Sequence, residues 1–143
     1  MQSARWLPWL ACAPVAVTAG WMLADGARAI LVGDYVTPSA GPYAGQLGPW
    51  ADLLAAVGLN PRSTAVKVLH VTYGATTLVA ITRFLRRRPS AGAHLRVAAF
   101  AGLWYLPFGT VLNGVALALL SLPAMRRYEP PTALRREPRA SGR

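Results

Sequence analysis

The sequence predicts an all-α membrane protein with four transmembrane helices and a short interfacial helix on the outer surface. Three observations predict this fold: long apolar runs, a shortage of charged residues, and arginines gathered between and after the runs. Of the 143 residues, 54% are hydrophobic and 14% are charged, whereas soluble domains carry about 25% charge. The net charge of +10 follows the pattern of membrane topology, so no nucleic-acid partner is expected.

The first apolar run, residues 6–23, has no charged residue and matches the length that a transmembrane helix needs. Apolar residues resume at 29–32, so the helix has room to continue that far. We expect an uncleaved helix. Two alternatives stay open: signal-peptide cleavage at the small residues 17–19 or 27–29, and lipidation of Cys12, for which Trp9 is a poor match.

Glycines and prolines punctuate residues 33–61, which predicts a loop. Within it, Pro49 and Asp52 suit the first turn of a helix that Gly58 would end. The spacing places four apolar residues on one face of this helix: Trp50, Leu53, Leu54 and Val57. Ten residues cannot cross a bilayer, so we expect an external interfacial helix, with a re-entrant pore helix as the alternative.

The second predicted span covers residues 64–84, and an apolar stretch at residues 91–122 follows it. As one helix that stretch would measure about 48 Å, against a hydrocarbon core of about 30 Å. Pro107 lies in its middle, where it would remove a backbone hydrogen bond and clash with the preceding turn. We therefore expect two short spans, 91–106 and 108–122, which turn at Pro107 and Gly109. A single third helix remains the alternative.

The arginines decide between these topologies, because Lys and Arg favour cytoplasmic loops. Four spans with the N-terminus inside leave three basic residues outside: Arg28, Arg62 and Lys67. The other twelve are then cytoplasmic: Arg5, Arg83, Arg86, Arg87, Arg88, Arg96, Arg126, Arg127, Arg135, Arg136, Arg139 and Arg143. Three spans would move the last six outside. We therefore expect a multi-pass protein of the cell inner (plasma) membrane, with both termini cytoplasmic.

Aromatic residues support the same layout, because Trp and Tyr favour the two membrane interfaces. The inner set is Trp6, Trp9 and Tyr128, and the outer set is Trp50, Trp104 and Tyr105. We divide the chain into a helical transmembrane domain, residues 1–125, and a disordered basic cytoplasmic tail, residues 126–143. The partners expected are the lipid bilayer, whose anionic headgroups the arginines would bind, and a protein partner or a second copy of the chain.

Small residues and intramembrane polar residues are the candidate contact and functional positions. Small residues at four-residue spacing predict helix packing at Ala16, Gly20, Ala24, Ala98 and Gly102. Ionisable or polar residues within spans are functional candidates by default, and here they are Asp25, Arg28, Lys67, His70, Tyr73 and Asn113. The structural alternatives are an ion pair of Asp25 with Arg28 or Lys67, a backbone bond of His70, and a cross-helix partner for the amide of Asn113.

The sequence predicts no cofactor and no enzyme. It has one cysteine, and no Cys/His cluster has metal-ligand spacing. A haem between His70 and His94 is improbable, because the topology puts these residues at opposite membrane faces. No nucleophile–base pair is visible.

The segment 104–110, Trp-Tyr-Leu-Pro-Phe-Gly-Thr, precedes an apolar helix. It resembles a turn in small uncharacterised bacterial four-helix membrane proteins, where proline, an apolar residue, glycine and threonine open the final span. Those proteins commonly continue with glycine, isoleucine and tyrosine, whereas this chain has Asn113, Gly114 and Val115. The resemblance covers about the last 35 residues of the membrane region; it implies the four-span topology and no activity.

Two functions fit these features. The first is an accessory or scaffold subunit of a membrane complex, without catalytic activity. The alternative is a small transporter or channel that uses Lys67, His70 and Asp25. It would be oligomeric, because four short helices enclose little volume. An enzyme ranks last.

Overall fold

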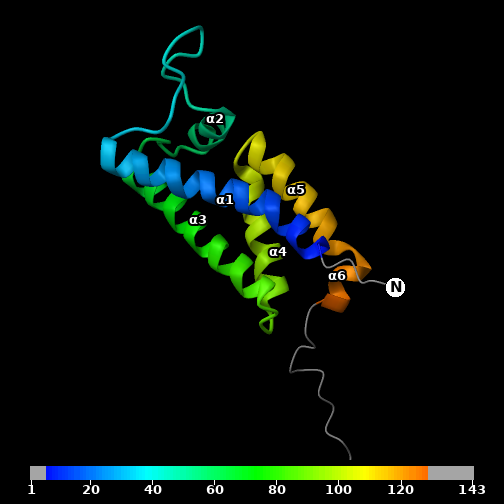
Figure 1. Cartoon of the computed structure of the whole chain (residues 1–143). Helices are drawn as coiled ribbons and strands as arrows, with labels where there is room; N and C mark the ends of the chain where they lie inside the picture. Colours follow the sequence, from blue (N-terminus) through cyan, green and yellow to red (C-terminus); the bar gives the residue numbers. More distant parts are fainter. Residues whose placement is uncertain (1–5, 129–143) are drawn as a thin grey trace, which may run out of the picture.

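The computed structural model describes residues 6–128, and these residues are all-helical, as predicted. In order, the elements are α1 (Leu7–Val32), α2 (Pro49–Ala56), α3 (Thr64–Leu85), α4 (Ala91–Ala101), the 3-10 turn η1 (Gly102–Trp104), α5 (Phe108–Ser121) and α6 (Pro123–Tyr128). Helix α1 runs the length of the molecule and packs on both α3 and α5 (Figure 1).

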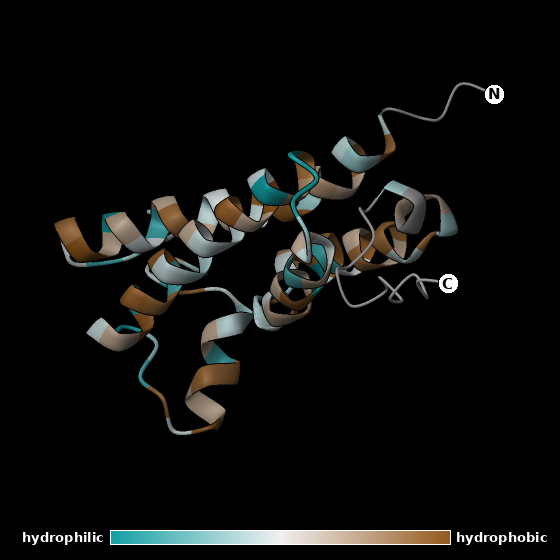
Figure 2. Cartoon of the chain, turned by 90° about the horizontal axis from the view of Figure 1, so that it is seen from below, coloured by the Kyte–Doolittle hydropathy of each residue, from teal (hydrophilic) through white to brown (hydrophobic). Residues whose placement is uncertain are grey.

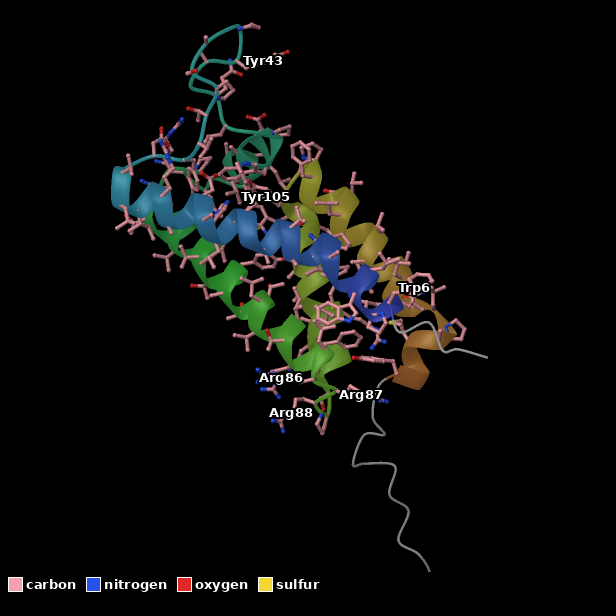
Figure 3. All side chains as sticks on the ribbon, viewed as in Figure 1. Trp6, Tyr43, Arg86, Arg87, Arg88 and Tyr105 are labelled. Carbon is pink, nitrogen blue, oxygen red and sulfur yellow. The ribbon has the colours of Figure 1, made fainter. Side chains whose placement is uncertain are left out.

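The bundle has two different ends. At the loop end, the end of α1, the start of α3 and η1 meet under α2 and the loop 33–48 (Figure 1). At the arginine end, Arg86, Arg87 and Arg88 connect α3 to α4, near α6 and the start of α1. Figure 3 labels these arginines and Trp6 at this end, with Tyr43 on the loop at the other.

Helices α1 and α3 are long and apolar enough to cross a membrane. Their 26 and 22 residues correspond to about 39 and 33 Å. Helix α5 is apolar but has only 14 residues. Apolar residues also cover the outside of the helices (Figure 2). Large side chains that lie exposed there include Val17, Leu31, Val79, Val97, Phe100 and Val111.

The stretch 91–122 is not a single helix, so the structure contradicts the helix on which the three-span alternative depends. Helix α4 ends at Ala101, earlier than predicted, and α5 folds back beside it (Figure 1). The cis peptide Leu106–Pro107 lies in the turn, where proline has no N–H to continue a helix. The backbone requires glycine at Gly109, because a Cβ there would lie 2.6 Å from the carbonyl oxygen of Gly102.

Helix α2 begins at Pro49 as predicted and ends two residues before Gly58. Its predicted apolar face is only partly correct. Trp50 and Leu54 are buried together with Ala51, whereas the other two predicted members, Leu53 and Val57, are exposed. One face of this short helix therefore packs against the bundle, and Leu53 and Val57 lie outside that face.

The small-residue ridge predicted on α1 is not its contact face. Ala24 is exposed, Ala16 is half-buried, and the space beside Gly20 is open. The buried face lies to one side, at Val15, Ala19, Met22, Gly26 and Ala29. Small residues occur on more than one face of α1, and α3 packs on the face that includes Ala19 and Gly26.

Glycines set the close approach of the helices. A Cβ on Gly74 would lie 2.5 Å from the carbonyl oxygen of Ala19, and one on Gly26 would lie 2.7 Å from the Cβ of His70. On α4's side, Gly102 is buried against Tyr73 and Asn113, while Ala98 is half-buried. Of the five predicted packing residues, Gly102 thus makes the closest contact.

Two hydrophobic cores fill the bundle. The arginine-end core consists of Ala11, Cys12, Val15, Ile81, Phe84, Ala91, Leu95, Ala99, Ala116, Leu120 and Met125. The loop-end core consists of Met22, Ala29, Tyr35, Trp50, Ala51, Leu54, Val66 and Tyr105. The first is mostly aliphatic, and the second is rich in aromatic rings.

Helix α6 passes the predicted domain boundary at residue 125 and continues to Tyr128. The Tyr128 hydroxyl donates to the Leu85 carbonyl at 3.1 Å, and the Arg87 guanidinium lies over the Tyr128 ring at 5.0 Å. These contacts extend the folded domain to residue 128. The rest of the predicted tail, residues 129–143, and Arg5 lie outside the described residues.

Candidate functional site

A cavity of about 670 Å³ lies at the loop end. Helix α1 forms one wall through Val17, Thr18, Trp21 and Asp25. The loop before α2 and the turn before α5 form the others, with Tyr43 on the loop side and Tyr105 beneath α2 (Figure 3). Asp25 is the one charged side chain among the described residues that line it. Its volume lies in the range of small-molecule sites.

Asp25 is 5% exposed, and its Oδ1 accepts a hydrogen bond from the Val36 N–H at 2.7 Å. The predicted ion pair with Arg28 or Lys67 does not form. Within residues 6–128 the one ion pair joins Arg62 Nε to Asp34 Oδ1 at 2.9 Å. The buried carboxylate therefore has a backbone partner and no cation.

The two expected cations bind carbonyls of the chain instead. Arg28 donates to the Asp34 carbonyl at 2.6 Å, and the Lys67 ammonium donates to the Gly33 carbonyl. The reason is local: α1 ends at Val32, and cations near a helix C-terminus interact favourably with its dipole and its unpaired carbonyls. These two residues fasten the start of the loop and do not line the cavity.

His70 is fully buried next to this cavity, behind Trp50 and Tyr105. Its Nδ1 lies 2.9 Å from the Val66 carbonyl. A carbonyl only accepts, so Nδ1 carries the hydrogen, and the predicted backbone bond is present. Nε2 has no hydrogen-bond partner. A proton on Nε2 would create a buried N–H without an acceptor, which favours the neutral ring.

Four aromatic rings surround the His70 imidazole. Their centroids lie 5.1 Å (Tyr35), 4.9 Å (Trp50), 5.5 Å (Trp104) and 5.7 Å (Tyr105) from its own. Three of these residues were expected to form an outer aromatic belt. They do lie at one end of the bundle, but they gather around His70 because the turn before α5 brings Trp104 and Tyr105 under α2.

Tyr35 is the one ring around His70 that the sequence did not mark as a candidate. It is 2% exposed, and its hydroxyl has no partner among the described residues. Burial raises the pKa of Tyr35, and the nearby negative charge of Asp25 raises it further. The only signal in the sequence was a large aromatic residue within a segment of glycines and prolines.

Tyr73 and Asn113 form a separate polar pair that packs against Gly102. The Tyr73 hydroxyl donates to the Ala98 carbonyl at 3.1 Å, which links α3 to α4. Asn113 Nδ2 donates to the Gly109 carbonyl at 2.8 Å within its own helix, and Oδ1 has no partner. The predicted cross-helix partner for this amide is therefore not observed, because the Gly109 carbonyl lies one turn earlier and within reach.

The six predicted polar residues thus lie in three places. Asp25 and His70 share the cavity region, Tyr73 and Asn113 lie deeper in the bundle, and Arg28 and Lys67 hold the loop. Within residues 6–128 no group of three His, Cys, Asp or Glu side chains is placed to hold a metal ion. Cys12 lies in the arginine-end core, and His94 is exposed at the start of α4.

No family model, curated protein or solved structure matches this chain. The functional argument therefore depends on the site itself.

Proposed function

We propose that this chain is a four-span inner-membrane protein that acts as a non-catalytic accessory subunit by holding an amphiphilic molecule at its periplasmic end. Both termini would be cytoplasmic. The observation that carries the proposal is the cavity beside the buried Asp25 carboxylate.

The charge distribution supports the orientation. Arg86, Arg87 and Arg88 lie at the end opposite the loop (Figure 3), and clusters of this kind favour the cytoplasm. Helices α4 and α5 are shorter than a bilayer core. Local thinning of the bilayer would accommodate them as two short spans, and the chain would return to the arginine side.

The surroundings of the cavity support an amphiphile as the bound molecule. Val17, Trp21 and Phe108 line it and are 60%, 50% and 71% exposed. In a membrane these exposed apolar surfaces face lipid, so a molecule would enter from the bilayer. One polar group at the Asp25 end would then meet the carboxylate while the apolar body remained against the walls.

Transport is the second candidate, favoured by three polar residues inside the bundle: His70 and Tyr73 on α3 and Asn113 on α5. On α3 the last buried polar side chain is Thr77, and the buried residues that follow it, Ala80, Ile81 and Phe84, are apolar. A polar path through one copy therefore ends halfway, and a transporter would need several copies or a second conformation. This is why binding ranks above transport.

Photolabelling tests the binding function. A fatty amine that carries a diazirine, added to native membranes, is expected to label the cavity walls of α1 and α5. Leu112→Trp would fill the cavity and suppress the labelling, whereas Val115→Trp, on an exposed position of the same helix, would not. Labelling that is uniform along both helices and insensitive to Leu112→Trp would contradict the proposal.

Native mass spectrometry tests the accessory role. Released from membranes in mild detergent, the chain is expected to remain bound to a stoichiometric partner or to a second copy. Release as a single chain without any partner would contradict the role of subunit.

A further inference from the structure

We propose that the cavity recognises an alkylammonium group carried on an apolar body, with the Asp25 carboxylate as its counter-ion. This inference rests on the proposed binding function and specifies the chemical class of the ligand.

The Asp25 carboxylate is buried and has one oxygen without a partner in the described part of the chain. Only 5% of Asp25 is exposed, and its Oδ1 already accepts a hydrogen bond from the Val36 N–H. No hydrogen bond within the described residues occupies Oδ2, and no cation lies within ion-pair distance. A buried carboxylate in a membrane span is costly unless a partner compensates its charge.

The candidate cations of the chain are engaged elsewhere. Arg28 and Lys67 bind the carbonyls of Asp34 and Gly33, and Arg62 binds the Asp34 carboxylate. The neighbouring His70 donates its Nδ1 hydrogen to Val66 and has no acceptor for a second one. No cation of the described residues lies within ion-pair distance of Asp25, so the position beside Oδ2 is open to the cation of a bound molecule.

The walls select the kind of cation. Trp21, Trp50 and Tyr105 line the cavity, and the Trp21 indole N–H donates to the Tyr105 hydroxyl at 3.0 Å, which fixes both rings. Aromatic faces beside a carboxylate are the recognised environment for organic ammonium groups. An inorganic cation would need several oxygen ligands in place of its water, whereas most residues that line the cavity are apolar and Asp25 is the one carboxylate among them.

Two sources carry this chemistry: the headgroup of an aminophospholipid such as phosphatidylethanolamine, and a free amphiphilic amine. The cavity accepts the same group from either source. The experiment below distinguishes them by changing the lipid.

Binding is measured on the full-length protein in nanodiscs of phosphatidylglycerol, which has no ammonium group, with empty nanodiscs subtracted. The probe is radiolabelled 4-phenylbutyltrimethylammonium, and its comparison molecule is the neutral isostere in which carbon replaces nitrogen. We expect the wild type to bind the ammonium probe at least about tenfold more tightly than the isostere.

Asp25→Asn is expected to remove this preference, because the amide oxygen keeps the Val36 hydrogen bond but loses the charge. Asp52→Asn is the matched control: it removes the same charge at the exposed first turn of α2, outside the cavity, and should preserve the preference. Should Asp25→Asn fail to fold, Trp21→Leu is expected to reduce the preference by removing one aromatic wall, and an unchanged ratio in that variant would overturn the inference.

Phosphatidylethanolamine titrated into the nanodiscs separates the sources. Competition with the probe would support the lipid headgroup, and its absence would support a free amine. Equal binding of probe and isostere that Leu112→Trp abolishes would overturn the ammonium assignment but leave the proposed binding function standing. If neither the probe nor its isostere showed binding that Leu112→Trp abolishes, both the ammonium assignment and the proposed binding function would be overturned.

Discussion

The two ends of the bundle are held together by different chemistry. The arginine-end core packs aliphatic side chains from α1, α3, α4 and α5 against each other, with Phe84 and Tyr128 as its aromatic contact. The loop-end core packs rings around the buried His70 and contains unpartnered polar atoms on His70 and Tyr35. Aliphatic side chains leave no polar atom to satisfy, whereas each buried polar atom without a hydrogen-bond partner costs stability.

The cavity lies at the loop end. Asp25 is on the buried face of α1, but the loop residue Val36 is its hydrogen-bond partner. The site therefore depends on how the loop and α2 dock on the bundle, and the arginine end serves as the frame. The predictions below separate these two roles.

The largest effect is expected from Gly74→Leu. A side chain at this position would collide with the Ala19 carbonyl and with Leu23, both on the neighbouring helix α1. The backbone of α1 cannot yield as a flexible side chain would, so we expect loss of the monodisperse folded protein, a cost at or above about 5 kcal/mol. Size-exclusion chromatography in detergent measures the outcome.

Gly20→Leu is the matched control, because a Cβ there meets nothing within 4 Å. It should remain folded. If Gly20→Leu were the damaging substitution and Gly74→Leu the harmless one, the assignment of the contact face of α1 would be wrong.

The next effect is local. Trp50→Ala removes the ring that contacts Tyr35, His70, Trp104 and Tyr105. Truncation of a buried tryptophan costs about 3–5 kcal/mol. We expect faster hydrogen exchange in α2 and the loop 33–48 while the arginine end keeps its protection.

Phe84→Ala makes the matching test at the arginine end. It removes the aromatic ring of the arginine-end core, so the faster exchange should appear around α6 and the start of α4. Equal changes at both ends for both variants would show that the bundle opens as one unit, and the comparison of two separate cores would fail.

The smallest effect concerns pH. Burial raises the pKa of Asp34, but the Arg62 hydrogen bond, the Tyr35 N–H and the Arg62 and Lys67 charges outweigh it, so the pKa is lowered. A carboxyl whose pKa is depressed on folding stabilises the folded state above its unfolded value, near 3.9, and this contribution is lost as the pH falls through the folded value.

Because both partners are about half exposed, the contribution should not exceed about 1 kcal/mol. The protection factors of the loop amides, which correct the exchange rates for their intrinsic dependence on pH, are expected to fall in acid for the wild type and to fall less in Asp34→Asn. An identical acid dependence in the two proteins would show that Asp34 does not anchor the loop.

The sequence predicted the elements well, because each has a local cause. Apolar length predicted α1 and α3, Pro107 predicted the break in the last stretch, and Pro49 predicted the start of α2. The contact faces were predicted less well. Small residues occur on more than one side of α1, and nothing local to Gly20 reveals that α3 passes along Ala19 and Gly26 instead.

The candidate site was also predicted only in part. Asp25 and His70 stood out because ionisable residues are rare in apolar spans. Their surroundings could not be predicted, because Tyr35 and Trp50 reach His70 only through the path of a long loop. The carbonyls that capture Arg28 and Lys67 were equally hidden, since backbone acceptors leave no trace in residue type.

The orientation of the two ends is the central claim, and cysteine labelling tests it most directly. In a Cys12→Ala background, one cysteine is placed at Tyr43 on the loop or at Arg88 between α3 and α4, and intact cells are treated with a membrane-impermeant maleimide. The account predicts labelling at residue 43, and at residue 88 only after the membrane is permeabilised. Labelling at residue 88 in intact cells, with residue 43 protected, would contradict it.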